Sequence, residues 1–158
     1  MATRIGVGKS THRKADEAAR LAVEQARTPL GHLQPDFALV FATTGYDQAA
    51  LLESIRALLG EVPISGCSAE GLITREGSDE SNYALGIMLI SSDSIRFEAL
   101  RVGGLKEDSG ASGRELARRA QGLGGGKALL LFPDGLTVNS SPLLAGVHES
   151  LGDLCVIG

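Results

Sequence analysis

The residues best suited to chemistry lie in a short loop between two glycines, Gly66–Gly71. This loop supplies a thiol from Cys67, a hydroxyl from Ser68 and a carboxylate from Glu70. It follows a buried strand predicted over Val62–Gly66, and open α/β sheets bind their ligands at the carboxyl ends of such strands. A tight turn with a half-buried cysteine accounts for the same residues. Binding of a small polar ligand is therefore one of two open interpretations of this loop.

Catalysis by Cys67 is the alternative chemistry. A thiolate nucleophile needs a partner such as histidine, and the chain has three, His12, His32 and His148. The nucleophile-elbow pattern G-x-S-x-G does not fit the loop. Cys67 and Cys155 are too few for a disulfide framework and lack the spacing of metal ligands. We therefore predict a binding function with no catalytic and no metal residue, and keep a thiol-dependent enzyme as the alternative.

Two further loops follow predicted buried strands. Thr43 and Thr44 come after the apolar run Phe37–Ala42, and Asp134-Gly135 comes after the apolar run Ala128–Phe132. Asp134-Gly135 is an ordinary turn signal when it is read alone. If the strands lie side by side and parallel, however, all three loops open on one edge of the sheet and line one cleft. The predicted ligand-binding residues are Thr43, Thr44, Gly66, Cys67, Ser68, Glu70, Asp134 and Gly135.

The segment Gly6–Thr11 ends like a phosphate-binding loop. Such a loop reads G-x-x-x-x-G-K-[ST], and its first glycine would fall at Thr3. The dinucleotide pattern G-x-G-x-x-G fails as well, because Thr11 stands where the third glycine belongs. We expect a plain turn from a strand into a helix, without a nucleotide site.

Composition excludes several classes of protein. The 158 residues carry 15 basic and 19 acidic side chains, mixed along the chain, for a net charge of −4. Binding to nucleic acid is not expected, because it requires a basic stripe. The apolar runs are the length of strands and too short to span a membrane. With no secretory signal pattern, the expected setting is the cytoplasm.

The predicted fold is α/β, with a mixed β-sheet, or two stacked sheets, flanked by helices. Two βαβαβ-like units surround a central β-meander. In the first unit, alanines from Ala15 to Ala26 share one helix face, and Ser10 or Thr11 is expected to cap that helix. Asp47 is expected to cap the next helix. The predicted buried stripe of that helix is Leu51, Leu52, Ile55, Leu58 and Leu59.

Sequence patterns also predict the elements of the central meander and of the second unit. Strands are predicted over Leu72–Thr74 and Asn82–Ser91, on either side of a solvated loop. The segment Ser94–Gly103 is predicted to pair with the second of these strands. Ser112 with Glu115 forms a capping-box pattern that opens a helix. The glycine run at 122–126 is predicted to be a flexible connection.

Part of the chain repeats. Leu51-Leu52 and Gly66 match Leu143-Leu144 and Gly158, about 92 positions later. The first copy continues past Gly66 into the loop described above, whereas the second copy stops at Gly158. We therefore expect a single domain over residues 1–158 that is truncated at its C-terminus.

Three motifs together resemble the N-terminal FIST domain. They are Leu39-Val40-Phe41 with Tyr46-Asp47, then Pro63–Gly71, then Leu131-Phe132-Pro133-Asp134-Gly135. In that family a Gly-Cys-(Ser/Thr) turn follows a buried strand, and a Phe-x-Asp-Gly turn comes later. The resemblance extends from about Ile5 to Gly158, because the order and spacing of the motifs agree along that length.

The resemblance implies a sensory domain of bacterial signal transduction that binds a small molecule such as an amino acid. No cofactor is expected from these residues, and the chain has no Cys-x-x-Cys-His. Because some members of the family are reported to bind haem and sense nitric oxide, a haem-binding nitric oxide sensor is the alternative. The family normally continues into a C-terminal FIST domain. Its absence from this chain implies that the signal passes to that missing part or to a partner protein.

Overall fold

The computed structural model describes residues 2–124 and 126–158, so Gly125 of the predicted glycine connection lies outside the described residues. The chain forms two compact units, residues 1–99 and 100–158. Both combine helices with β-strands, which confirms the predicted mixed α/β class. None of the described helices is long and apolar enough to cross a membrane.

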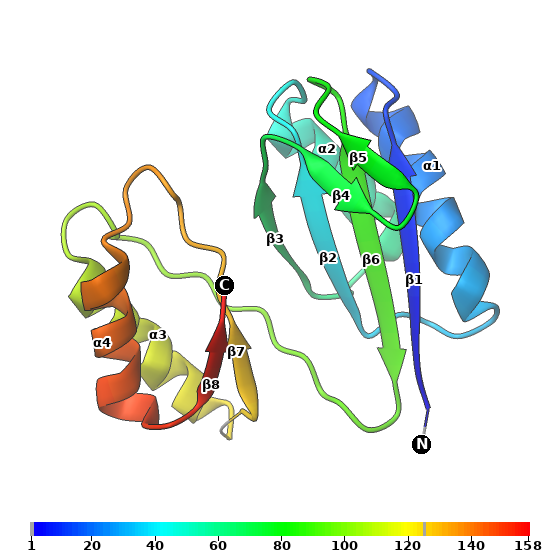
Figure 1. Cartoon of the computed structure of the whole chain (residues 1–158). Helices are drawn as coiled ribbons and strands as arrows, with labels where there is room; N and C mark the ends of the chain where they lie inside the picture. The colour runs from blue at the N-terminus through cyan, green and yellow to red at the C-terminus, as the bar shows by residue number, and fades with distance from the viewer. Residues whose placement is uncertain (1, 125) are drawn as a thin grey trace. The chain divides into compact units, whose positions relative to one another are not determined.

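The first unit is built on a four-stranded sheet in the order β1-β6-β2-β3. Strand β6 runs antiparallel to both of its neighbours, while β2 and β3 are parallel. Two long helices and a short 3-10 turn cover one face of this sheet (Figure 1). The strands are β1 (Thr3–Ser10), β2 (Phe37–Ala42), β3 (Ile64–Ser68) and β6 (Leu85–Ser92). The helices are α1 (Ala15–Arg27), η1 (Thr28–Leu30) and α2 (Gln48–Leu59).

Helix α1 lies very close to β1 because both surfaces carry small residues. The alanines predicted on one face of this helix lie in the core, as expected. Gly6 and Gly8 of the strand lie directly against them. A Cβ atom at Gly8 would lie 1.9 Å from the carbonyl oxygen of Ala22. The predicted cap by Ser10 or Thr11 is wrong. The helix begins only after Lys14, because Ser10 and His12 instead accept hydrogen bonds within the preceding turn.

Helix α2 begins as predicted. The Asp47 carboxylate accepts hydrogen bonds from the N–H groups of residues 49 and 50, which satisfies two donors of the first turn. Leu51, Ile55 and Leu59 are buried, as the stripe predicted. Leu58, however, is 39% exposed, because it lies on the flank of the helix that turns away from the sheet.

The strand predicted over Leu72–Thr74 is confirmed as β4. It pairs with β5 (Gly77–Asp79), which lies in the segment predicted to be a solvated loop, and the two strands form a separate hairpin. The strand prediction for segment 94–103 is wrong. The segment 94–103 forms no strand among the described residues. The physical reason is that β1 and β2 already occupy both edges of β6. Phe97 of this segment instead stacks on Phe37, with ring centroids 5.2 Å apart.

The second unit joins a pair of helices to a small parallel sheet. Its elements are α3 (Ser109–Gly122), β7 (Ala128–Leu130), α4 (Ser140–Leu151) and β8 (Cys155–Ile157). The capping-box prediction is wrong, because Asp108 caps α3 by accepting from the Ala111 N–H. Ser112 is buried inside the helix, where its hydroxyl donates to the carbonyl of Gly103.

Candidate functional site

The loops after β2 and β3 leave the first sheet at the same edge. The last paired residues of the two parallel strands are Ala42 and Ser68. Beyond them, the Ala69 N–H donates to the Ala42 carbonyl at 2.9 Å and ties the two loops together. The structure therefore brings the predicted loop at Thr44 next to the predicted loop at Gly66–Gly71. We call this the β2–β3 edge, made of residues 42–45 and 67–71.

The side chains at the β2–β3 edge differ in their solvent exposure. Thr44, Cys67, Ser68 and Glu70 are exposed. Thr43 is only 2% exposed, and its hydroxyl accepts from the Ala84 N–H at 2.8 Å. Because that hydroxyl is used by the fold, Thr43 supports the edge from behind, and the exposed groups are the ones that face solvent.

Cys67 carries an unactivated thiol. It lies opposite Phe41 in the parallel pairing, near the end of β3. Although the residue is exposed, the atoms around its sulfur desolvate it enough to raise the pKa of the thiol. A raised pKa keeps the sulfur protonated at neutral pH and weakens it as a nucleophile.

Asp134 and Gly135 belong to the second unit, in the loop after β7. Both residues are exposed. The Asp134 carboxylate accepts from the N–H of Leu136 at 3.0 Å and from the hydroxyl of Thr137 at 2.9 Å. This side chain therefore closes its own turn, as Asp often does. Its participation in a site with the loops of the first unit stays a prediction.

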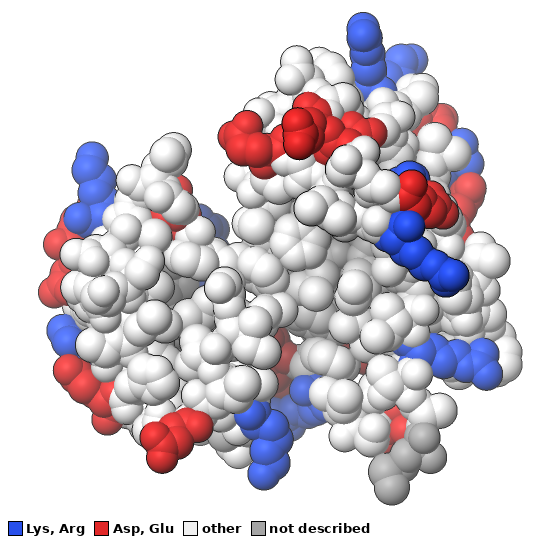
Figure 2. All heavy atoms as spheres, in the orientation of Figure 1, with Lys and Arg blue, Asp and Glu red and all other residues white. Residues whose placement is uncertain are grey.

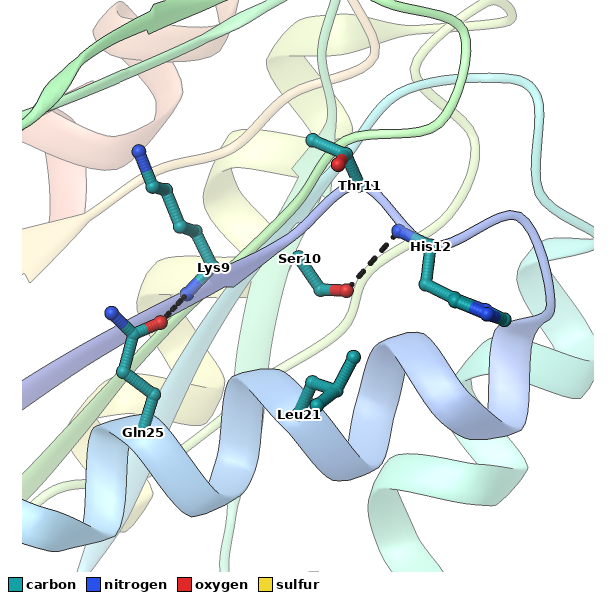
Figure 3. Close-up of a pocket in the computed structure, with 6 residues that line it drawn as sticks. All are labelled: Lys9, Ser10, Thr11, His12, Leu21 and Gln25. Atoms are coloured by element: carbon teal, nitrogen blue, oxygen red, sulfur yellow. Dashed lines mark hydrogen bonds between the residues drawn. The ribbon is translucent and has the colours of Figure 1, made fainter.

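Sequence reasoning missed a polar hollow at the end of β1. Strand β1 runs in the same direction as β2, since both are antiparallel to β6. Its carboxyl end therefore lies at the same edge of the sheet as the β2–β3 edge. The hollow has a volume of about 570 Å³ (Figure 3). It is lined by Lys9, Ser10, Thr11, His12, Leu21 and Gln25.

Hydrogen bonds fix the walls of this hollow. The His12 N–H donates to the Ser10 hydroxyl at 3.2 Å, and the Gln25 side-chain oxygen accepts from the Lys9 N–H at 2.8 Å (Figure 3). The predicted turn from a strand into a helix is present, because residues 11–14 connect β1 directly to α1. The available signal was the run of polar residues from Lys9 to His12, which ends the glycine-rich strand β1 and continues beyond it.

A buried tyrosine connects the end of β1 to the start of α2. The Tyr46 hydroxyl donates to the His12 carbonyl at 2.9 Å, and its ring packs edge-on against Tyr83 at 5.3 Å. Arg13 lies over the Tyr83 ring, 6.0 Å from its centroid. Burial, and then the nearby Asp79 carboxylate, raise the pKa of Tyr46, so its hydroxyl stays a donor. These contacts join the end of β1 to the segment that leads into α2.

A second hollow, of about 480 Å³, lies at the opposite edge of the sheet, away from the predicted site. Its residues include Asp36, whose carboxylate accepts from the Ser92 N–H at 2.7 Å. Both hollows are open to solvent. No group of three metal-ligating side chains occurs among the described residues. His148 uses Nδ1 in a 2.8 Å hydrogen bond with the Gly152 carbonyl.

Charged side chains of both signs lie on the surface. Figure 2 shows a group of acidic side chains at the top of the first unit, and other acidic and basic side chains scattered over the rest of the face drawn. Many charged groups are paired locally on helices, such as Arg20 with Glu17 and Glu24 on α1.

Comparison with known proteins supports one family. The model of the FIST N domain matches residues 36–158, which is most of the chain. A similar sequence is an uncharacterized protein of Mycobacterium tuberculosis strain H37Rv, 29% identical over 162 residues. That match covers 98% of this chain and 40% of the relative. An uncharacterized protein of Mycobacterium bovis is 28% identical over 159 residues, covering 98% of this chain and 39% of the relative.

The chain thus spans about two fifths of the length of these relatives. Among solved structures, the TubZ protofilament protein of Bacillus thuringiensis matches with a TM-score of 0.38 and 13% identity. That match covers 77% of this chain and 31% of the other. An FtsZ of M. jannaschii matches with a TM-score of 0.36 and 17% identity, over 65% of this chain and 33% of that one. Scores this low carry no argument about function.

Proposed function

From the premise that the chain belongs to the FIST N domain family, we propose that it senses a small polar ligand at the β2–β3 edge. FIST domains are sensory domains of signal-transduction proteins. The observation that carries the proposal is the convergence of Thr44, Ser68 and Glu70, all exposed, on two loops joined by the bond from Ala69 to Ala42. Such a place, at the carboxyl end of parallel strands, is where α/β sheets bind ligands.

An amino acid fits the chemistry of this edge. The Glu70 carboxylate can pair with an ammonium group, and charge-assisted hydrogen bonds of this kind are strong. The hydroxyls of Thr44 and Ser68 can donate to a carboxylate. With only six Phe and Tyr residues in 158 and no Trp, the chain offers few aromatic surfaces for stacking a base or sugar.

The pKa of Cys67 favours a binding function over catalysis by this thiol. Burial raises the pKa of Cys67, whereas a catalytic cysteine needs a lowered one. A haem-based nitric oxide sensor is the second candidate, favoured only by the family. The exposed hydroxyls and carboxylate of the β2–β3 edge favour a small polar ligand over a large apolar macrocycle.

The signal must leave this chain to have an effect. The relatives are more than twice as long as the matched region, so a further part of a longer protein or a separate signalling protein is the proposed receiver. We place the sensor in the cytoplasm, where amino acids are abundant. Ligand binding would shift the population between two arrangements of the edge, and that shift is the signal.

A thermal-shift screen tests this function directly. The chain is melted with each standard amino acid, with small carboxylates and with haemin. A ligand that binds only the folded chain adds about 2.7 kcal/mol of stability at 100 times its Kd. Glu70→Gln is expected to abolish the shift for a ligand with an ammonium group. Glu53→Gln, which changes an exposed carboxylate on α2, is the matched control and leaves the shift intact.

Two results would count against the proposal. A melt that no amino acid or carboxylate shifts would remove the proposed ligand class. A shift that survives both Glu70→Gln and Ser68→Ala would move the site away from the β2–β3 edge. A shift with haemin alone, accompanied by a visible absorbance band, would favour the haem-based candidate.

A further inference from the structure

The hairpin β4–β5 is a separate piece of the first unit. Its two strands pair only with each other, through three residue pairs, and they do not join the four-stranded sheet. Figure 1 shows the hairpin lying across the face of the sheet opposite α1 and α2. A two-stranded ribbon this short has little stability of its own. Its position must therefore come from its contacts with the sheet and from its two ends.

Two contacts hold the hairpin down on the sheet. Leu72 packs over Gly86 of β6, where a Cβ atom on the glycine would be in ordinary van der Waals contact with the leucine Cδ1, at 3.4 Å. At the turn of the hairpin, Glu76 pairs with Lys9 of β1, with Nζ and Oε2 3.0 Å apart. These two side chains are 60% and 40% exposed, so the ion pair contributes little net stability. We call this pair the latch.

Both ends of the hairpin are anchored to the same short segment, residues 42–45. On the entering side, the Ala69 N–H donates to the Ala42 carbonyl at 2.9 Å. On the leaving side, the Gly45 N–H donates to the Asn82 carbonyl at 2.9 Å, and the Thr43 hydroxyl accepts from the Ala84 N–H.

The second anchor is closely fitted. A Cβ atom at Gly45 would lie 2.0 Å from the Asn82 oxygen, so only glycine allows this approach. Between the first anchor and β4 there are only two residues, and one of them is Glu70. The side chain proposed to contact the ligand therefore lies on a stem of the hairpin.

From these contacts we infer that the hairpin is a flap, hinged at residues 69–71 and 80–82, whose position is set by segment 42–45. Closed, it covers Gly86 with Leu72 and is held by the latch. Open, it exposes the apolar face of the sheet around β2 and β6. Its role as the readout of ligand binding rests on the proposed function, because Glu70 and Thr44 lie on or beside its hinges. The flap itself needs no ligand to be observed.

Hydrogen exchange followed by mass spectrometry tests the flap in the full chain without added ligand. The amides of residues 72–79 report flap opening, and those of β6 report global stability in the same sample. Glu76→Gln breaks the latch and is expected to speed exchange of the hairpin about twofold to fivefold, with β6 unchanged. Arg75→Gln, at the neighbouring turn position, leaves the latch intact and is the matched control.

A second pair of variants acts at the other contacts. Gly86→Val puts a branched side chain under Leu72 and should speed hairpin exchange about tenfold. Thr43→Val removes the hydroxyl that accepts from the Ala84 N–H at the second anchor. This change should speed hydrogen exchange of the hairpin at least tenfold as well. Hairpin amides that are as protected as those of β6, and that respond to none of the three variants, would overturn the flap. That result would leave ligand binding at Glu70 untouched, so the two proposals fail separately.

Discussion

The segments β2–α2–β3 and β7–α4–β8 have the same order of elements, and in both the two strands pair in parallel. Each also has a glycine in or just after its second strand that lies against a carbonyl in or just after its first strand. A Cβ atom at Gly66 would lie 1.8 Å from the Val40 oxygen, and one at Gly158 would lie 2.6 Å from the Leu131 oxygen. The repeat predicted from the sequence therefore has a counterpart in the structure.

The two regions differ in what their small residues contact. In the first unit, Gly6 and Gly8 bring strand β1 close to helix α1. In the second unit, Gly113 and Gly146 bring α3 and α4 together instead, with a Cβ at Gly113 only 2.2 Å from the Leu143 oxygen.

The burial of the strands differs as well. The central strands of the first unit carry fully buried residues, while Leu130 and Ile157 in the second unit are 46% and 56% exposed. Repeated apolar spacing thus fixes the order of elements, but the position of the glycines decides which neighbour each helix packs against.

The largest effect is expected from filling the contact between α1 and β1. Gly8→Ala places a methyl group 1.9 Å from a backbone oxygen that cannot move without displacing α1. We expect a loss of more than about 3 kcal/mol in the free energy of unfolding, measured by urea denaturation. Gly103→Ala, where a Cβ meets nothing within 4 Å, is the control and should be close to neutral. Equal midpoints for the two variants would show that α1 is not seated as described.

The corresponding change in the second unit should act on the helix pair. Gly113→Ala forces α3 away from the Leu143 carbonyl and should cost about 2 kcal/mol. Faster hydrogen exchange in α3 and α4, with the amides of α1 unchanged, is the expected signature. Gly122→Ala, on the same helix but with no atom within 4 Å of its Cβ, should not speed exchange there. Faster exchange in α1 but not in α4 would show that Gly113 does not act on the contact between α3 and α4.

The caps of the two equivalent helices offer a finer comparison. Asp47 accepts two hydrogen bonds at the start of α2, whereas Asn139 holds the same position before α4 without a side-chain hydrogen bond. Asp47→Ala should therefore cost about 1 kcal/mol of stability, and Asn139→Ala under about 0.5 kcal/mol. Thermal denaturation of both variants measures the difference. A larger loss at Asn139 would contradict the structure of the second cap.

The smallest effect concerns a surface carboxylate of the second unit. Hydrogen bonds from Arg118 and Arg119 lower the pKa of Glu115 from 4.5 to about 2. A lowered pKa means that the group favours the folded state above the pKa of the unfolded chain, and that this contribution is lost as pH falls from about 4.5 through about 2. Because the group is exposed, the effect on stability should be small and weakened by salt.

Titration of the Glu115 carboxyl by NMR checks this value. Arg118→Gln together with Arg119→Gln should move the midpoint back toward 4.5. A midpoint near 4.5 in the unchanged chain would show that the two guanidinium groups do not hold Glu115 in solution.

The sequence was enough to predict features that depend only on residues close together in the chain. The alanine face of α1 and the Asp47 cap were predictable, because a helix face and a cap depend on residues within a few positions. The parallel pairing of β2 and β3 was expected from two strands separated by a helix. The predicted burial of the second strand is wrong, because β3 (Ile64–Ser68) is only half-buried to exposed and lies at the edge of the sheet.

Long-range competition accounts for the errors. The pattern at 94–103 resembles a strand, but no edge of β6 was left to receive it. Ser112 with Glu115 resembles a capping box, but Asp108 lies earlier and takes the first turn. At the candidate site, the bond from Tyr46 to His12 joins residues 34 positions apart, and no spacing in the sequence announces it. The commitment of Thr43 to Ala84, 41 positions away, was hidden for the same reason.

Strand β1 is the last strand of its sheet, and the outer side of its backbone faces away from β6. Exposed edges of this kind invite strands of other molecules to add on, which leads to aggregation. The Gln25 side chain, drawn in Figure 3 as a wall of the hollow, already accepts the hydrogen bond of the Lys9 N–H. One helix side chain thus occupies a donor that an incoming strand would need. The same glutamine that shapes a polar hollow also helps to keep crowded copies of the chain from joining edge to edge.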